Sequence, residues 1–236
     1  MMDPMAESHE LLPLLDRASD RLLATVDGLA DAAFTEPSGL PGWSRAHVVA
    51  HLALNGEALA AALAAVAVGQ EVPMYRSQEA RDEDIAELAG HEPTQVRTRL
   101  RTAVRGYAGA LSLLADGAGT TVIHRTPGSS RRFTADETVA MRLAETEIHH
   151  ADLAAGYSRD DWDDAFARHL VTRLAGQQAV ACVLRATDTG DEWTIAGGEG
   201  PVVSGSVADL GWWLTGRGGQ ERLTVSSGPM PTIGKW

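Results

Sequence analysis

Residues 44–68 read SRAHVVAHLALNGEALAAALAAVAV, a stretch rich in alanine and leucine whose apolar positions recur at helical spacing. Ser44 follows the Pro41-Gly42 break and stands where the N-cap of a helix is expected. Similar stretches fill the chain as far as about residue 157, with few β-branched residues between them. This texture predicts a bundle of helices.

Turn-forming residues divide this first region into five expected helices. We place them at residues 6–33, 44–68, 77–89, 93–115 and 134–156. The run Pro127-Gly128-Ser129-Ser130 breaks the chain before the fifth helix. Thr134 and Glu137 have the spacing of a capping box at the start of that helix.

From about residue 158 the pattern changes to short apolar runs of β type that alternate with short helical stretches. We expect helices at 161–177 and 206–215, and strands at 179–187, 192–196, 201–203 and 222–226. The predicted fold class is therefore α+β, with a helical bundle over residues 1–157 and a smaller α/β domain over residues 158–236.

The charge balance excludes some classes of partner. The chain has 20 Lys and Arg against 32 Asp and Glu, a formal net charge of −12, which is the wrong sign for binding nucleic acid or an anionic membrane. No segment approaches the roughly 20 uncharged apolar residues of a membrane span. The N-terminal residues also lack a basic stretch followed by an apolar one. We expect a cytoplasmic protein and, by default, a monomer.

The single cysteine, Cys182, excludes an internal disulfide framework. It stands in the apolar run 179–184, which is typical of a buried strand. We therefore interpret it as a small core residue and not as a reactive thiol.

The expected helix 134–156 places charged and apolar residues on one face. Four residues fall within about 60° of Glu145 on a helical wheel, namely Met141, Ile148, His149 and Asp152. Glu147 and His150 point elsewhere. Because an unpaired buried charge is costly, Glu145 and His149 need a common partner such as a metal ion, or each other as an ion pair. On this helix alone both interpretations stay open.

The second expected helix adds His47 and His51, which are also four residues apart. His51 is central and flanked by apolar residues, so it is the better inward-facing candidate. His51, Glu145 and His149 together give two imidazoles and one carboxylate, a set that suits zinc and leaves a coordination position open, as in catalytic sites.

Two alternatives concern the ligand set. His47 with His51 is a competing pair on one helix. Asp152 is either an alternative ligand or an outer carboxylate that orients His149, and we favour the outer position.

Several short motifs are spread over both regions. They read PGWSRAHVVAHL at 41–52, PMY at 73–75, EARDEDI at 79–85, ETEIH at 145–149, VVSGS at 202–206 and GRG at 216–218. This set resembles the mycothiol-dependent maleylpyruvate isomerases of actinobacteria over nearly the whole chain. The resemblance implies a metal-binding helical bundle of the DinB type, followed by a small α/β domain.

The resemblance also implies site residues and a reaction. His51, Glu145 and His149 fall on the family's ligands of a divalent metal, normally zinc, and Arg81 and Arg217 fall on pocket arginines. The implied reaction converts maleylpyruvate to fumarylpyruvate in gentisate degradation. Mycothiol would be required but not consumed, because its thiolate would add to the double bond, allow rotation and then leave. The implied partners are thus mycothiol and a small dicarboxylate substrate, whose carboxylates arginines can grip.

Without the resemblance both arginines have plainer interpretations. Arg81 stands among acidic residues, where a surface ion pair is ordinary. Arg217 lies between glycines, as in many exposed turns.

Two other functions compete with the isomerase. A mycothiol S-transferase would use the same metal and thiol but release a conjugate. A metal-binding regulator resembling an anti-sigma factor would need no reaction at all. The paired arginines favour the isomerase, because they match a substrate with two carboxylates.

Overall fold

The computed structural model describes residues 4–115 and 117–234, and these form two compact units. The first unit extends to Tyr157 and the second begins at Ser158. The first is a helical bundle with a short hairpin, and the second combines helices with a small mixed sheet. The predicted α+β class, a helical bundle followed by a smaller α/β unit, is confirmed.

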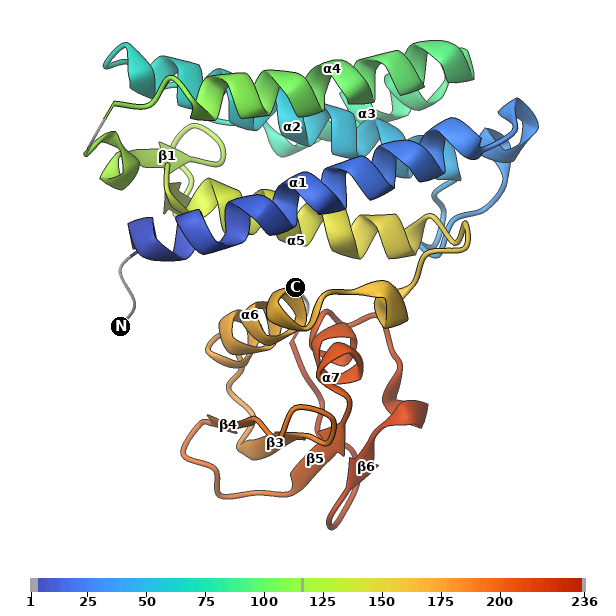
Figure 1. Ribbon diagram of the computed structural model, residues 1–236, viewed down its shortest axis with the longest axis vertical. Helices are drawn as coiled ribbons and strands as arrows, with labels where there is room; N and C mark the ends of the chain where they lie inside the picture. Colours follow the sequence, from blue (N-terminus) through green and yellow to red (C-terminus); the bar gives the residue numbers. More distant parts are fainter. Residues whose placement is uncertain (1–3, 116, 235–236) are drawn as a thin grey trace. The chain divides into compact units, whose positions relative to one another are not determined.

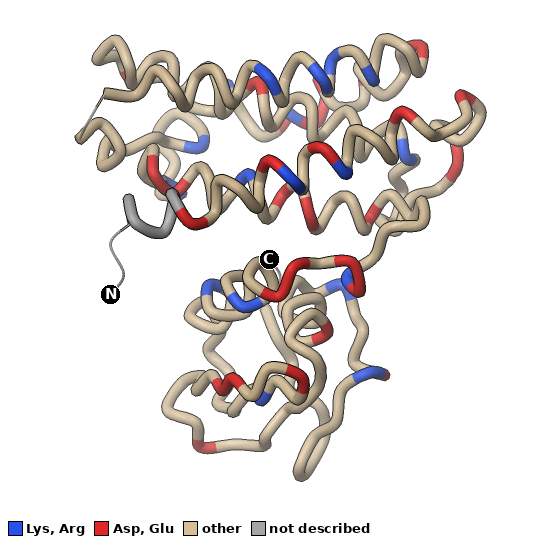
Figure 2. The backbone as a smooth tube through the Cα atoms, in the orientation of Figure 1, with Lys and Arg blue, Asp and Glu red and all other residues tan. Residues whose placement is uncertain are grey.

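Over residues 4–115 and 117–157, the first unit contains five long helices (Figure 1). They are α1 (Pro4–Gly28), α2 (Arg45–Ala67), α3 (Gln78–Ala89), α4 (Pro93–Leu111) and α5 (Glu137–Asp152). The main packing pairs are α2 with α4 and α1 with α5, while α3 packs on α2. Basic positions are spaced along α4 (Figure 2). Among the described residues, three of them form ion pairs with neighbouring elements: Arg97 with Asp31, Arg99 with Glu57 and Arg101 with Asp27.

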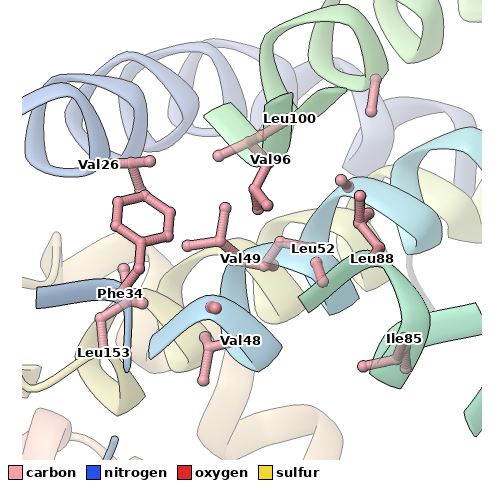
Figure 3. Close-up of a cluster of buried hydrophobic side chains, with 14 of the residues drawn as sticks. Val26, Phe34, Val48, Val49, Leu52, Ile85, Leu88, Val96, Leu100 and Leu153 are labelled. Carbon is pink, nitrogen blue, oxygen red and sulfur yellow. The ribbon is translucent and has the colours of Figure 1, made fainter. Parts of the chain in front are cut away.

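Helix α2 is the core element of this bundle. Val48, Val49 and Leu52 are fully buried and belong to one cluster with Val96 and Leu100 of α4 (Figure 3). By length and composition alone α2 is apolar enough to cross a membrane, although it contains the charged residues Arg45 and Glu57 and so is not an uncharged apolar run. The apolar window is 67% buried inside the protein, as expected for a helix that supplies the core.

Three predicted helices of the bundle end four or five residues earlier than expected, and the one predicted over 134–156 ends at Asp152. The helix predicted over 6–33 ends at Gly28, and Asp31–Thr35 form a 3-10 turn, η1. Arg97 of α4 accounts for this end, since its guanidinium donates to the carbonyls of Val26 and Leu29 at 3.1 and 2.5 Å. If the helix continued, those carbonyls would accept hydrogen bonds from backbone N–H groups of the next turn. The helix predicted over 93–115 ends at Leu111.

A hairpin replaces the start of the helix predicted over 134–156. Strands β1 (Val122–His124) and β2 (Arg132–Thr134) pair antiparallel, and α5 begins only at Glu137. The hydroxyl of Thr134 and its backbone N–H both donate to Glu137 Oε2, at 3.1 and 2.7 Å. The predicted contact between these two residues therefore forms, but it joins β2 to α5.

The second unit has a four-stranded sheet in the order β4-β3-β5-β6. Its elements are α6 (Asp164–Ala175), β3 (Cys182–Ala186), β4 (Glu192–Ile195), β5 (Val202–Gly205), α7 (Val207–Leu214) and β6 (Thr224–Val225). Strands β3 and β5 run parallel, and the other pairs are antiparallel. Cys182 is buried in β3, as predicted, and Ser206 caps α7 by accepting from the backbone N–H of Asp209 at 3.1 Å.

Candidate metal centre

Three side chains of the predicted ligand set meet between α2 and α5. His51 Nε2 lies 2.9 Å from Glu145 Oε2, and His149 Nε2 lies 3.3 Å from the same oxygen. One ligand atom from each residue fits within a span of 4.8 Å. Over residues 4–115 and 117–234, this is the group of histidines and carboxylates with a geometry that could hold a metal ion.

Polar ties between α5 and the chain around α2 fix this arrangement. Arg142, one turn before Glu145, donates from Nη1 to the carbonyl of Leu52 and to Asn55 Oδ1, both at 2.8 Å. Gly56 leaves space for the guanidinium, since a Cβ there would lie 3.3 Å from Arg142 Nη2. These contacts set the register that brings His51 opposite Glu145.

The other end of α5 is held in the same way. Arg45 Nε, at the start of α2, donates to the carbonyl of Leu153 at 2.9 Å. The backbone N–H of Gly39 donates to the carbonyl of Asp152 at 2.7 Å. Both ends of the α2–α5 contact are therefore anchored, and the triad lies between them.

Burial and mutual contacts set the protonation states of the triad. Burial lowers the pKa of His51 to about 4, and the neighbouring His149 acts in the same direction. Burial would raise the pKa of the Glu145 carboxyl, but hydrogen bonds with His149 and His51 hold that pKa well below its usual range. At neutral pH the site thus offers a carboxylate and a neutral imidazole, the forms that bind metals.

Asp152 supports His149 from behind. His149 Nδ1 lies 2.8 Å from Asp152 Oδ2, and the Asp152 side chain is 2% exposed. Burial would lower the pKa of His149, but the contacts with Asp152 and Glu145 raise it. A carboxylate on the far nitrogen orients the ring and directs Nε2 toward the centre. This contact agrees with the outer position that we favoured for Asp152, and its role toward a metal stays a prediction.

The competing histidine pair does not form. His47 Nδ1 lies 2.8 Å from the Ser44 hydroxyl at the N-terminus of α2, away from the triad. Glu147 and His150 lie on other faces of α5, as the helical wheel predicts, although both are buried.

The residues present fit a divalent metal. In a tetrahedral zinc site with bonds of about 2.0–2.1 Å, neighbouring ligand atoms lie roughly 3.4 Å apart. The separations of Glu145 Oε2 from the two imidazole nitrogens, 2.9 and 3.3 Å, are close to this value, and all three ligand atoms lie within 4.8 Å of one another. Two imidazoles and one carboxylate are also donors that zinc commonly takes.

Of the two predicted arginines, Arg81 lies beside the triad. From α3 it places Nη2 at 3.1 Å from His51 Nδ1, while Nη1 donates to Asp82 at 2.7 Å. The surface ion pair is therefore present, but the other end of the same guanidinium reaches the site. Arg217 belongs to the second unit, where its Cζ lies 5.9 Å from the centre of a Trp212 ring. Its part in the site stays a prediction.

Sequence reasoning missed two residues near the triad. Tyr75 precedes α3 and lies under Arg81, whose Cζ is 5.7 Å from the ring centre. Arg125 follows β1, and its Cζ is 5.3 Å from the same ring. The motif at 73–75 pointed to Tyr75 without giving it a role. No sequence signal marked Arg125, because the hairpin that carries it was not predicted.

Residues 15–154 match the family described as mycothiol maleylpyruvate isomerase N-terminal domain. The chain belongs to this family. Two solved structures resemble it over 100% of both chains with a TM-score of 0.88. They are a mycothiol-dependent maleylpyruvate isomerase at 29% identity and a histidine-to-alanine mutant of a protein so described at 28% identity. A comparison with curated sequences gives no match. The resemblance of this chain to mycothiol-dependent maleylpyruvate isomerases is confirmed.

Proposed function

We propose that this chain catalyses the mycothiol-dependent cis–trans isomerisation of maleylpyruvate to fumarylpyruvate, a step of gentisate degradation. The observation that carries the proposal is the triad of His51, Glu145 and His149 with Arg81 at its edge. Its setting in a member of the mycothiol maleylpyruvate isomerase family supports the choice of reaction.

The triad would hold a divalent metal, and its donor set favours zinc. Such a metal supplies Lewis acidity that lowers the pKa of a bound thiol. The thiol would come from mycothiol and not from the chain, because Cys182 is buried in β3 and burial raises the pKa of its thiol.

The chain's own residues supply orientation and charge. Asp152 Oδ2 lies 2.8 Å from His149 Nδ1, a contact that would orient the ring with Nε2 toward the centre. Arg81 presents a guanidinium at the edge of the triad, where it can bind a substrate carboxylate through two hydrogen bonds. Arg217, which the family resemblance singles out, is the second arginine that we propose as a substrate-binding residue. One or both arginines would also stabilise negative charge that develops on the oxo-acid oxygen.

The test is a time course of maleylpyruvate isomerisation by the zinc-loaded protein, with and without mycothiol, in which the product is identified. We expect turnover only with mycothiol, and fumarylpyruvate as product. Mass spectrometry would detect a stable mycothiol conjugate, which would indicate the S-transferase instead. Absence of turnover in protein with bound zinc would overturn the isomerase proposal.

Variants distinguish the proposed metal ligands from the proposed substrate-binding arginine. His51→Ala, Glu145→Ala or His149→Ala should lose metal and turnover together, whereas Arg217→Ala should keep metal and lose turnover. Stoichiometric zinc in all three ligand variants would contradict the assignment of the triad.

A further inference from the structure

Arg125 is held firmly against the segment that carries Tyr75. Its backbone N–H donates to the carbonyl of Arg131 across the hairpin at 3.0 Å, and its carbonyl accepts from the backbone N–H of Tyr75 at 2.9 Å. The residue is therefore fixed by the β1–β2 hairpin on one side and by the approach to α3 on the other.

Two guanidinium groups contact the ring of Tyr75. The Cζ atoms of Arg125 and Arg81 lie 5.3 and 5.7 Å from the centre of its ring, within the range of cation–π contacts. Asn55 Nδ2 lies 3.5 Å from the Tyr75 hydroxyl, and Arg142 holds Asn55 from the other side. The Tyr75 ring is therefore held through Asn55 by Arg142, the same residue whose contacts position the triad.

The charge of Arg125 is poorly compensated. Its side chain donates to the neutral Gln78 Oε1 at 3.2 Å, and within the described residues no carboxylate lies at ion-pair distance from it. Arg81, in contrast, pairs with Asp82. Burial lowers the pKa of Arg125, and the like charges of Arg81 and Arg131 act in the same direction.

Arg125 is also close enough to Glu145 for that carboxylate to act on it electrostatically, in the opposite direction. A half-buried cation beside a second cation is unfavourable unless an anion joins them. Arg81 and Arg125 lie next to the triad, so an anion that joins them would bind there.

We propose that Arg125 is a substrate-binding residue of the active site, and that Arg81 and Arg125 together hold one carboxylate of a dicarboxylate ligand beside the triad. The choice of a dicarboxylate rests on the proposed function. Guanidinium groups suit this task because each can offer two parallel N–H donors to one carboxylate.

The test uses the zinc-loaded full chain with maleate as the probe, measured by isothermal titration calorimetry. The variants are Arg125→Met, Arg125→Lys and the control Arg132→Met, which removes an equal charge from an exposed position on the same hairpin. We expect Arg125→Met to raise the Kd for maleate about 10- to 100-fold, since it removes hydrogen bonds to a charged group. Arg125→Lys, which keeps the charge but loses the paired donors, should fall between, and Arg132→Met should match the unmodified protein.

Zinc content and thermal melting are measured alongside, and Arg125→Lys tests the proposal even if Arg125→Met fails to fold. The proposal would be overturned if both Arg125 variants kept the maleate affinity of the unmodified protein, or if Arg132→Met lost as much affinity as they do. It would also be overturned if the unmodified zinc-loaded protein did not bind maleate at millimolar concentration. If the unmodified protein binds maleate through Arg125 but does not isomerise maleylpyruvate, the proposed function fails and this inference stands. If it isomerises maleylpyruvate while both Arg125 variants keep the parental Kd and KM, the inference fails alone.

Discussion

Helix α5 carries a glutamate and a histidine on each of two sides, and the two pairs have different surroundings. On the side of α2, Glu145 contacts His149 and His51. On the side of α1, Glu147 Oε1 accepts from Arg21 Nη2 at 2.6 Å.

On the α1 side, Glu147 and His150 also contact the uncharged side chains of Tyr157 and Thr25. The hydroxyl of Tyr157 donates to Glu147, and its ring stacks on His150 with centres 3.7 Å apart. His150 Nε2 lies 2.8 Å from the Thr25 hydroxyl. Glu147 therefore has a permanent cation, whereas the ion-pair partners of Glu145 in the described structure are both histidines. A buried glutamate and histidine at helical spacing do not by themselves make a metal centre, and the identity of the counter-charge separates the two cases.

Matched substitutions of the two glutamates test this comparison most strongly. Glu145→Gln removes the anionic ligand, so we expect zinc to be lost, with a fall in activity beyond the about 10- to 100-fold typical of outer partners. Glu147→Gln removes a buried carboxylate from the same helix and should keep zinc and activity in the folded fraction. Metal content by atomic absorption and initial rates measure both. Zinc bound at full stoichiometry in Glu145→Gln would break the distinction.

Removal of the cation tests the α1 side. Arg21→Met leaves Glu147 buried without its counter-charge, a change that costs about 3–5 kcal/mol for a fully buried pair. Because the Arg21 side chain is 39% exposed, water compensates in part, and we expect a loss of about 2 kcal/mol in the free energy of unfolding. Denaturant titration measures it, with zinc content unchanged.

The control for this variant is Arg101→Met, which breaks the half-exposed pair with Asp27. Its cost should stay below about 1 kcal/mol. Equal losses in the two variants would mean that Glu147 behaves as a surface carboxylate despite its burial.

Much of the fold could be predicted from the sequence because the helices of the bundle are long and carry clear periodicity. The stretch 44–68 became α2 with a change of one residue at each end. The hairpin at 122–134 could not be predicted, since strands of three residues are too short to show an alternating pattern. The early end of α1 depends on Arg97, which is distant in sequence and reaches the helix only in the folded chain.

The site divides in the same way. His51, Glu145 and His149 could be found because each lies on a periodic helix whose inward face the sequence reveals. The outer position of Asp152 follows from its place one turn beyond His149. Arg125 could not be found, because it depends on the missed hairpin and approaches the triad through Tyr75 and not along a helix.

Asp152→Asn tests how far metal binding on the α2 side depends on the contact between Asp152 and His149. The amide keeps the shape but loses the charge that holds His149, so we expect zinc affinity to fall about 10- to 100-fold. The pH dependence should change as well. Because Asp152 raises the pKa of His149, protons compete with zinc from a higher pH in the unmodified protein. Relative to its own value at neutral pH, the zinc affinity of the variant should therefore begin to fall at a lower pH than that of the unmodified protein. Chelator competition at a series of pH values would detect this, with Glu147→Gln as the control.

The smallest expected effect lies on the α1 side. Thr25→Val removes the hydroxyl that contacts His150 Nε2 at 2.8 Å. The loss of this one hydrogen bond should lower the free energy of unfolding by about 1 kcal/mol. Zinc affinity should not change, because Thr25 contacts the histidine that is not part of the triad. Thr102→Val, which removes an exposed hydroxyl bonded within its own helix, is the matched control. If Thr25→Val destabilises as much as Arg21→Met, the charge of Glu147 is not what distinguishes the α1 side. If Thr25→Val loses less free energy of unfolding than Arg21→Met, the two sides of α5 differ mainly in the counter-charge of their glutamates.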